Sequence, residues 1–186
     1  VQKEQGKILE AKISYQKGLE INPKNPQILI NLGSIFKIEG AFNKAINNIE
    51  KAIKLNPGKM SLVVGLNNLG SIYFQKRELE KALNHYKEAI KLDPEYLFSH
   101  YNIGGIYESL GKIELAIESH NNALKINKNF YFSFCKIITL KRYICDWNDS
   151  NQKFDYKNDK TKFSGFLPRD TFFIFDDPSL DLEIAQ

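Results

Sequence analysis

Three asparagines recur at a nearly constant spacing and could recognise a peptide backbone. Asn31, Asn68 and Asn102 follow one another at spacings of 37 and 34 along the chain, and each immediately precedes a Leu-Gly or Ile-Gly pair. An amide side chain offers both a hydrogen-bond donor and an acceptor, so it can pair with the N–H and C=O groups of any peptide. The same amides could instead tie neighbouring helices together, and the sequence favours neither role over the other.

Other residue types that often carry chemistry do not converge on a catalytic centre. His85, His100 and His120 fall at or beside expected packing positions, so we interpret them as structural residues rather than metal ligands. The chain holds no phosphate-binding glycine loop, no HExxH and no paired CxxC. Asp177 precedes Pro178, which predicts a helix start with Asp177 as its N-cap rather than an acidic site. We therefore expect no catalytic residue, no metal and no cofactor in these 186 residues.

The composition narrows the range of partners. With 42% hydrophobic and 26% charged residues the chain is expected to fold, and no apolar run approaches the ~18 residues of a membrane span. The net charge is +4, but only three of the 26 basic residues are arginines, whereas nucleic-acid readers lean on arginine. Neither a membrane nor a nucleic acid is therefore an expected partner.

The two cysteines give a weak indication of the compartment. Cys135 and Cys145 lie ten residues apart on a predicted helix, and at about 100° per residue they face different directions. They cannot pair within that helix, and two cysteines are too few for a disulfide framework. This favours a reducing compartment, so the expected location is the cytoplasm.

A repeated segment of about 34 residues organises the chain from residue 3 to residue 144. Asn-Pro or Asp-Pro dipeptides end at Pro23, Pro57 and Pro94, and one further repeat length reaches Lys128. Each dipeptide follows an amphipathic stretch, such as "YQKGLEINP" or "YKEAIKLDP". Because proline disfavours helix at the residue before it, each dipeptide predicts a helix stop at a fixed phase.

Between these stops, three segments share one order of anchor residues. A first helix carries a glycine and, three residues later, an aromatic side chain; a turn leads to a second helix with two alanines seven residues apart. The anchors are Gly33, Phe36, Gly40, Ala45 and Ala52; then Gly70, Tyr73, Arg77, Ala82 and Ala89; then Gly104, Tyr107, Gly111, Ala116 and Ala123. This order resembles the tetratricopeptide repeat (TPR). The resemblance implies an all-α fold of antiparallel helix hairpins in a right-handed superhelix, with the first helices lining a concave face.

The repeats depart from the pattern at three places. Arg77 replaces the turn glycine, and Lys128 replaces the last proline. Three extra residues follow Pro57. This insertion predicts either a longer turn between repeats or one more turn of helix.

The same pattern predicts the domain organisation. Residues 1–128 form the TPR array of one partial and three full repeats, and the partial repeat is expected to turn at Gly6. Residues 129–145 form a terminal capping helix, in which Ile137-Ile138 takes the place of the Leu-Gly pair. Residues 146–186 form a partly irregular linker toward a missing C-terminal domain. Because the chain begins inside a repeat, we interpret it as a fragment.

The neighbours of the asparagines on the predicted groove are uncharged. Domains that capture a peptide C-terminus present lysine and arginine on their first helices, but here the corresponding residues are Ile30, Ser34, Asn67, Ser71, Tyr101 and Gly105. A carboxylate clamp is therefore not expected. Many lysines instead fall on the second helices, which indicates a solvated outer face: Lys44, Lys51, Lys54, Lys81, Lys87 and Lys91.

The point where the repeats stop carries a distinctive cluster, "YICDWNDS", at residues 143–150. A TPR array followed by "ICDW" resembles the junction in O-linked N-acetylglucosamine transferases and SPINDLY-like proteins. The asparagine line and the segment "GFLPRDTFFIFDDPSLDLEIAQ" also resemble parts of those enzymes. The resemblance implies that Trp147 marks a junction and that a nucleotide sugar would bind only beyond Gln186. Trp147 could equally cover the open end of the last helix.

Three interpretations of function remain open. The chain is the acceptor-recruiting part of such a protein glycosyltransferase, or a stand-alone TPR adaptor, or a TPR array fused to another class of transferase. In all three the chain itself is not catalytic, and its expected partner is a protein or peptide held in the concave groove.

Overall fold

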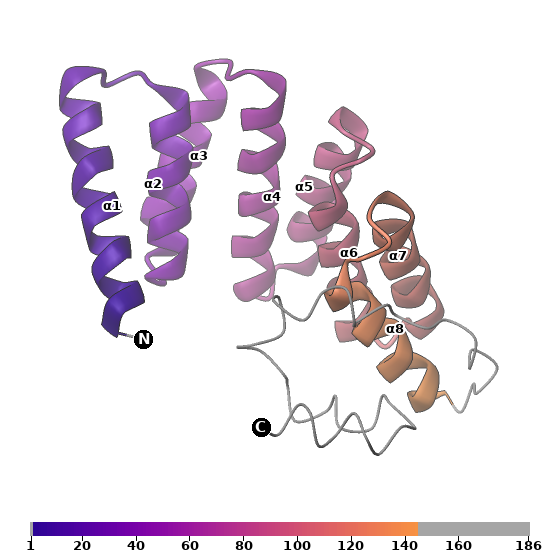
Figure 1. Ribbon diagram of the computed structural model, residues 1–186. Coiled ribbons are helices and arrows are strands. Elements are labelled where there is room, and N and C mark those ends of the chain that lie inside the picture. The colour runs from indigo at the N-terminus through magenta and orange to yellow at the C-terminus, as the bar shows by residue number, and fades with distance from the viewer. Residues whose placement is uncertain (1, 145–186) are drawn as a thin grey trace.

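The computed structural model describes residues 2–144, and these form eight helices (Figure 1). No β-strand occurs within that range, so the predicted all-α class is confirmed. None of the eight helices is both long and apolar enough to cross a bilayer. The helices are α1 (Gln2–Ile21), α2 (Pro26–Ile38), α3 (Phe42–Lys54), α4 (Lys59–Gln75), α5 (Leu79–Leu92), α6 (Leu97–Ser109), α7 (Ile113–Ile126) and α8 (Tyr131–Tyr143).

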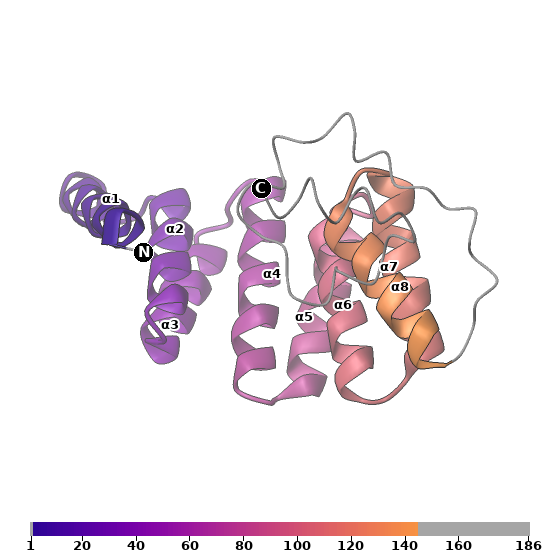
Figure 2. The same ribbon diagram turned by 60° about the horizontal axis from the view of Figure 1, so that its bottom comes forward.

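The helices pack as the predicted hairpins. Three pairs, α2 with α3, α4 with α5, and α6 with α7, form hairpins, while α1 packs on α2 and α8 packs on α7 (Figure 1 and Figure 2). We call α2, α4, α6 and α8 the first helices, and α1, α3, α5 and α7 the second helices. Along the array α2 contacts α4 and α4 contacts α6, so these first helices form a continuous row.

Each hairpin turns through a residue in the left-handed backbone conformation. The residues are Gly40, Arg77 and Gly111, with φ values of 73°, 64° and 67°. At the first turn the N–H of Ala41 donates to the carbonyl of Phe36 over 2.8 Å, and the other two turns repeat this bond. Such a bond satisfies helix-end carbonyls that would otherwise lack partners. The predicted turns are confirmed, and Arg77 adopts the glycine conformation although it has a side chain.

Glycine is required within α2, α4 and α6 because the second helix of the same hairpin approaches closely. A Cβ atom added at any of the three glycines would stand 2.5 or 2.6 Å from a side chain sixteen residues later in the chain. That side chain is buried in every case. The contacting pairs are Gly33 with Ile49, Gly70 with Tyr86, and Gly104 with His120.

The core lies between successive hairpins as well as within them. One cluster joins Ala45 and Ile49 of α3 to Leu69 and Ile72 of α4. The next cluster repeats it one hairpin later, with Ala82, Tyr86, Ile103 and Ile106. Helices α3 and α5 are thus each packed between their own first helix and the following one. The six lysines expected on the outer helices are all exposed.

The insertion after Pro57 was predicted to give either a longer turn between repeats or one more turn of helix. Helix α4 begins at Lys59 and has 17 residues, whereas α2, α6 and α8 have 13 each. The inserted residues therefore add a turn to the start of α4 rather than lengthen the loop.

The prediction of a turn at Gly6 is wrong, because α1 runs without interruption from Gln2 to Ile21. Helix α8 lies within the predicted capping helix at 129–145. The predicted linker at 146–186 and Trp147 lie outside the described residues.

Candidate functional site

The three predicted asparagines lie on consecutive first helices, but their surroundings differ. Asn68 of α4 is only 7% exposed. Its Nδ2 donates to the hydroxyl of Ser34 over 2.9 Å, and its Oδ1 accepts from the Nζ of Lys37 over 2.8 Å. Both partners are on α2, so Asn68 ties two repeats together and offers little surface to a ligand.

Asn102 and Asn31 are half-buried and keep hydrogen-bonding capacity. The Nδ2 of Asn102 donates over 3.0 Å to Asn67 of α4, which also accepts from Ser99. The Oδ1 of Asn31 accepts over 3.0 Å from Gln27, one turn earlier on the same helix. Within residues 2–144, the Nδ2 of Asn31 and the Oδ1 of Asn102 make no protein hydrogen bond.

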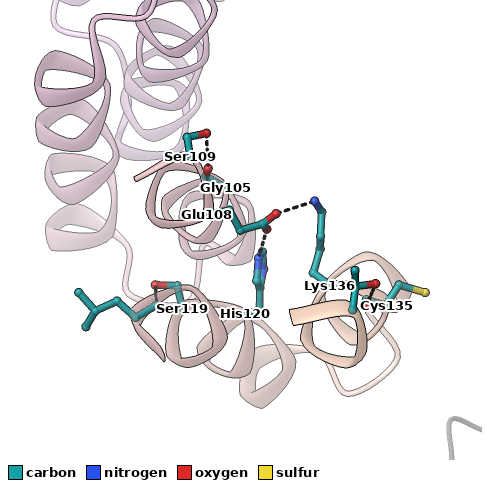
Figure 3. A network of polar contacts seen from close by, with 9 residues as sticks. Gly105, Glu108, Ser109, Ser119, His120, Cys135 and Lys136 are labelled. Atoms are coloured by element: carbon teal, nitrogen blue, oxygen red, sulfur yellow. Dashed lines mark hydrogen bonds and ion pairs between the residues drawn. The ribbon is translucent and has the colours of Figure 1, made fainter. Parts of the chain in front are cut away.

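At the end of the row, a network of charged side chains replaces the asparagine hydrogen bonds as the link between neighbouring first helices (Figure 3). Glu108 of α6 accepts from His120 of α7 over 2.9 Å and from the Nζ of Lys136 of α8 over 2.8 Å. Burial alone would raise the pKa of Glu108, but the hydrogen bonds from His120 and Lys136 outweigh it and hold the pKa below its usual value. Lys136 stands one repeat length after Asn102, so it occupies the asparagine position of α8.

The expectation of an uncharged surface needs two corrections. Lys37 and Lys136 both lie on first helices, and neither was predicted, because the expectation rested on the residues next to the asparagines. Each is engaged, Lys37 with Asn68 and Lys136 with Glu108, and burial lowers the pKa of Lys37. Ile30 was expected beside the groove but is fully buried.

Aromatic side chains gather where α6 and α8 begin, a feature that sequence reasoning did not single out. Phe98 and Phe132 are 48% and 55% exposed. The ring of Phe130 lies between them, with its centroid 5.9 Å from that of Phe98 and 5.7 Å from that of Phe132. The ring centroid of Tyr101 lies 5.4 Å from that of Phe130. We call these four residues the aromatic cluster. Phe98 and Phe132 are one repeat length apart, which was the available sequence signal.

The aromatic cluster and the asparagine line share one helix face. Residues four apart on a helix lie above one another, and Phe98 stands four residues before Asn102, as Phe132 does before Lys136. On α2 the equivalent pair is Gln27 and Asn31, whose side chains are hydrogen-bonded. This face therefore changes from amide-rich at α2 to aromatic at α6 and α8.

The remaining candidates for chemistry form no reactive site among the described residues. No group of three or more metal-binding side chains occurs in residues 2–144. Burial raises the pKa of the Cys135 thiol to about 11, which leaves it unreactive at neutral pH. His85 stacks on Tyr73, and His100 contacts the carbonyl of Pro94, as expected of structural residues. Cys145 and Asp177 lie outside the described part of the chain.

Sequence comparisons identify the repeats. Models described as "TPR repeat" and "Tetratricopeptide repeat" match residues 70–111 and 98–130, and a further tetratricopeptide repeat model matches residues 1–25 and 26–59. The chain is a TPR protein. No curated protein matches its sequence.

Solved structures share the TPR fold. Two structures of MamA are 24% identical to the chain, with TM-scores of 0.65 and 0.63. They cover 86% and 89% of this chain, and 92% and 90% of their own chains. The first TPR of Spaghetti (RPAP3), bound to the HSP90 peptide SRMEEVD, is 19% identical with a TM-score of 0.58, and the match covers 64% of this chain and 93% of that chain. None of these matches is specific to a glycosyltransferase.

Proposed function

We propose that the TPR row of first helices binds an extended segment of a partner protein, with the aromatic cluster as its apolar anchor. The exposure of Phe98 and Phe132 carries this proposal, because half-exposed aromatic rings lose water when a ligand covers them. Asn102, one turn from Phe98, supplies a carbonyl oxygen that can accept from a ligand backbone N–H. The ligand needs an apolar side chain beside a free backbone amide.

The magnitude of this interaction sets the length of the ligand. Covering the exposed half of both phenylalanine rings contributes about 2 kcal/mol. Hydrogen bonds at Asn31 and Asn102 add about 1 kcal/mol each. The total of about 4 kcal/mol corresponds to a dissociation constant near 1 mM before ordering costs. A partner that binds at micromolar concentrations must therefore cross several first helices.

The surface does not favour a ligand that depends on its terminal carboxylate. Lys37 and Lys136, the lysines described above on the first helices, already have partners in Asn68 and Glu108. A carboxylate would have to displace those partners. We therefore expect the peptide SRMEEVD to bind poorly, and we expect amidation of a ligand's C-terminus to leave its affinity unchanged.

Peptides selected from a random displayed library test the proposal. Their dissociation constants are measured by fluorescence anisotropy against the wild-type chain, Asn102→Ala and the double variant Phe98→Ala with Phe132→Ala. We expect the double variant to weaken binding at least tenfold. The matched control is Leu115→Ala, which removes a similarly exposed apolar side chain from α7, a second helix. Peptides that lose affinity with Leu115→Ala, or with neither change, would show that the aromatic cluster is not the anchor.

The parent protein's activity is a finer proposal, supported by the sequence resemblance of the asparagine line and of residues 143–150 and 165–186. On this proposal the TPR array recruits acceptor proteins and raises their concentration near a tethered glycosyltransferase domain. Sequencing the gene past Gln186 tests it. A nucleotide-sugar transferase domain in frame would support recruitment, whereas a nearby stop codon would favour the stand-alone adaptor.

A further inference from the structure

Helix α4 begins with a turn that α2, α6 and α8 lack. It has 17 residues and begins at Lys59, whereas the other three first helices have 13 residues each. Ser61 in the added turn donates over 2.6 Å to the side chain of Gln27 on α2, and Gln27 in turn donates to Asn31. A hydrogen bond between repeats therefore holds the added turn against α2.

The added turn exposes an apolar side chain. Met60 is the second residue of α4 and is 61% exposed. Phe98 and Phe132, which are also exposed, are the second residues of α6 and α8. Three successive first helices thus each present an exposed apolar side chain in their first turn.

Met60 lies on the same face of the row as the aromatic cluster. Met60, Val64 and Asn67 stand at positions i, i+4 and i+7, which share one side of a helix. Val64 is one repeat length from Phe98, and Asn67 is one repeat length from Tyr101, so both match members of the aromatic cluster. Val64 itself packs against buried residues of α2 and α3. Met60 therefore supplies the exposed apolar side chain that Val64 does not.

The register of α4 and α6 sets the distance between Met60 and Phe98. Asn67 accepts hydrogen bonds from Ser99 and from Asn102, so it lies level with the turn between them. Met60 is then displaced from Phe98 by about one helical turn, ~6 Å, along the helix axes. Because the axes of packed helices are about 8–10 Å apart, the two side chains leave the surface about 10–12 Å from each other.

An extended peptide can bridge these two side chains. Each residue of an extended chain spans about 3.3 Å, and side chains two or four residues apart point to the same side. Two residues span only about 7 Å, whereas four span about 13 Å. The geometry therefore favours a ligand with two apolar side chains four residues apart.

We propose that Met60 is a third apolar contact of the ligand site, and that the ligand carries two apolar side chains four residues apart. One of them lies against the aromatic cluster and the other against Met60. This inference rests on the proposed function, since it extends the same binding face from α6 and α8 onto α4. A methionine side chain is unbranched and flexible, so it accommodates apolar groups of different shapes. The position over Met60 thus requires an apolar side chain rather than one particular residue.

A double-mutant cycle tests the contact with Met60. A peptide selected on the wild-type chain is scanned with alanine, and dissociation constants are measured by fluorescence anisotropy. We expect two sensitive apolar positions four residues apart, and we expect Met60→Ala to weaken binding about fivefold. Alanine at the peptide residue over Met60 should weaken binding similarly, and both changes together should cost little more than either alone. The matched control is Lys59→Ala, an exposed residue of the same turn on another side of the helix.

Oxidation provides a second test, because Met60 is the only methionine of the chain. Hydrogen peroxide transfers one oxygen atom to its Sδ and is reduced to water, and the resulting sulfoxide is polar. We expect peroxide treatment to weaken peptide binding by at least the factor found for Met60→Ala, and methionine sulfoxide reductase to restore it. Met60→Leu should bind equally well before and after treatment, which controls for oxidation of Cys135 and Cys145.

The outcomes separate this inference from the proposed function. If Phe98→Ala with Phe132→Ala weakens binding but Met60→Ala does not, the third contact is wrong and the aromatic anchor stands. If neither change weakens binding, both proposals are wrong. Losses that simply multiply when Met60→Ala meets the altered peptide would also overturn the third contact, because they would show that Met60 acts on the chain rather than on the ligand.

Discussion

Replacement of each groove asparagine by alanine separates a linking role from a binding role. Asn68→Ala removes two hydrogen bonds between α2 and α4, one to a neutral hydroxyl and one to a charged amine. A neutral bond contributes about 1 kcal/mol and a bond to a charged group about 1.5–3 kcal/mol. Because Lys37 can swing its amine toward water, we expect the lower part of that sum, a loss of about 2–3 kcal/mol in the free energy of unfolding.

Substitution of the other two asparagines by alanine should lower the free energy of unfolding by a smaller amount. Asn102→Ala removes one bond, and its partner Asn67 still accepts from Ser99, so the expected loss is about 1 kcal/mol. Asn31→Ala removes an exposed bond to Gln27 within one helix, which contributes about 0.5 kcal/mol or less. The predicted order of destabilisation is therefore Asn68, then Asn102, then Asn31.

Urea denaturation followed by circular dichroism measures this order, with the m value checked so that a shift in midpoint reports stability alone. Peptide affinity is measured on the same variants. We expect Asn102→Ala and Asn31→Ala to weaken binding although they cost little stability. The reasoning would be refuted if Asn68→Ala stayed within about 0.5 kcal/mol of wild type, the range of an ordinary surface substitution, or if Asn31→Ala cost as much as Asn68→Ala.

Four further substitutions test the packing and the electrostatics. Arg77→Gly should raise the free energy of unfolding by about 0.5–1 kcal/mol, because it relieves a left-handed conformation that costs about 1–2 kcal/mol but also adds freedom to the unfolded chain. Gly40→Ala should lower the free energy of unfolding by a similar amount, because the new Cβ has no neighbour within 4 Å and only the left-handed conformation is penalised. Urea denaturation measures both changes. Gly104→Ala should lower the melting temperature more than Gly40→Ala does, because the new Cβ would stand 2.5 Å from the His120 ring. The lowered pKa of Glu108 means that its stabilising contribution is present above its usual pKa of 4.5 and is lost as the pH falls through the lower folded value. The difference in melting temperature between wild type and Glu108→Gln should therefore be largest near neutral pH and shrink in acid, and a constant difference would contradict the network.

The sequence pattern predicted the backbone better than the side-chain contacts. The turn at Arg77 could be placed because its neighbours in the pattern, Gly40 and Gly111, adopt the same φ. Gly6 looked like another such residue, but α1 runs through it without a turn. A helical glycine costs only about 1 kcal/mol, so the helix continues through it.

The partners of the asparagines could not be read from spacing. Periodicity fixes the direction of a Cβ atom, but it does not decide which of several polar groups within reach takes the hydrogen bond. Asn68 bonds to Ser34 and Lys37, whereas the matching Asn102 bonds to Asn67. The choice depends on the rotamers of long side chains on the neighbouring helix, which a single repeat does not encode.

Two links between first helices, the Lys37–Asn68 hydrogen bond and the Glu108–Lys136 ion pair, indicate which positions determine binding specificity. Both pairs join the same two positions of successive first helices, yet one is a cation with an amide and the other an ion pair. Positions that contact a neighbouring repeat must change in matched pairs, because one altered partner leaves a partly buried polar group without a bond. At α2 and α4 the position of Phe98 also contacts a neighbouring repeat, because Gln27 accepts from Ser61 over 2.6 Å and Val64 packs against the cluster of Leu29, Ile30 and Ala52. At α6 and α8 this position holds the exposed side chains of Phe98 and Phe132. Ligand selection is therefore expected to depend on these two side chains, while the asparagine position mainly preserves the stack on which it stands.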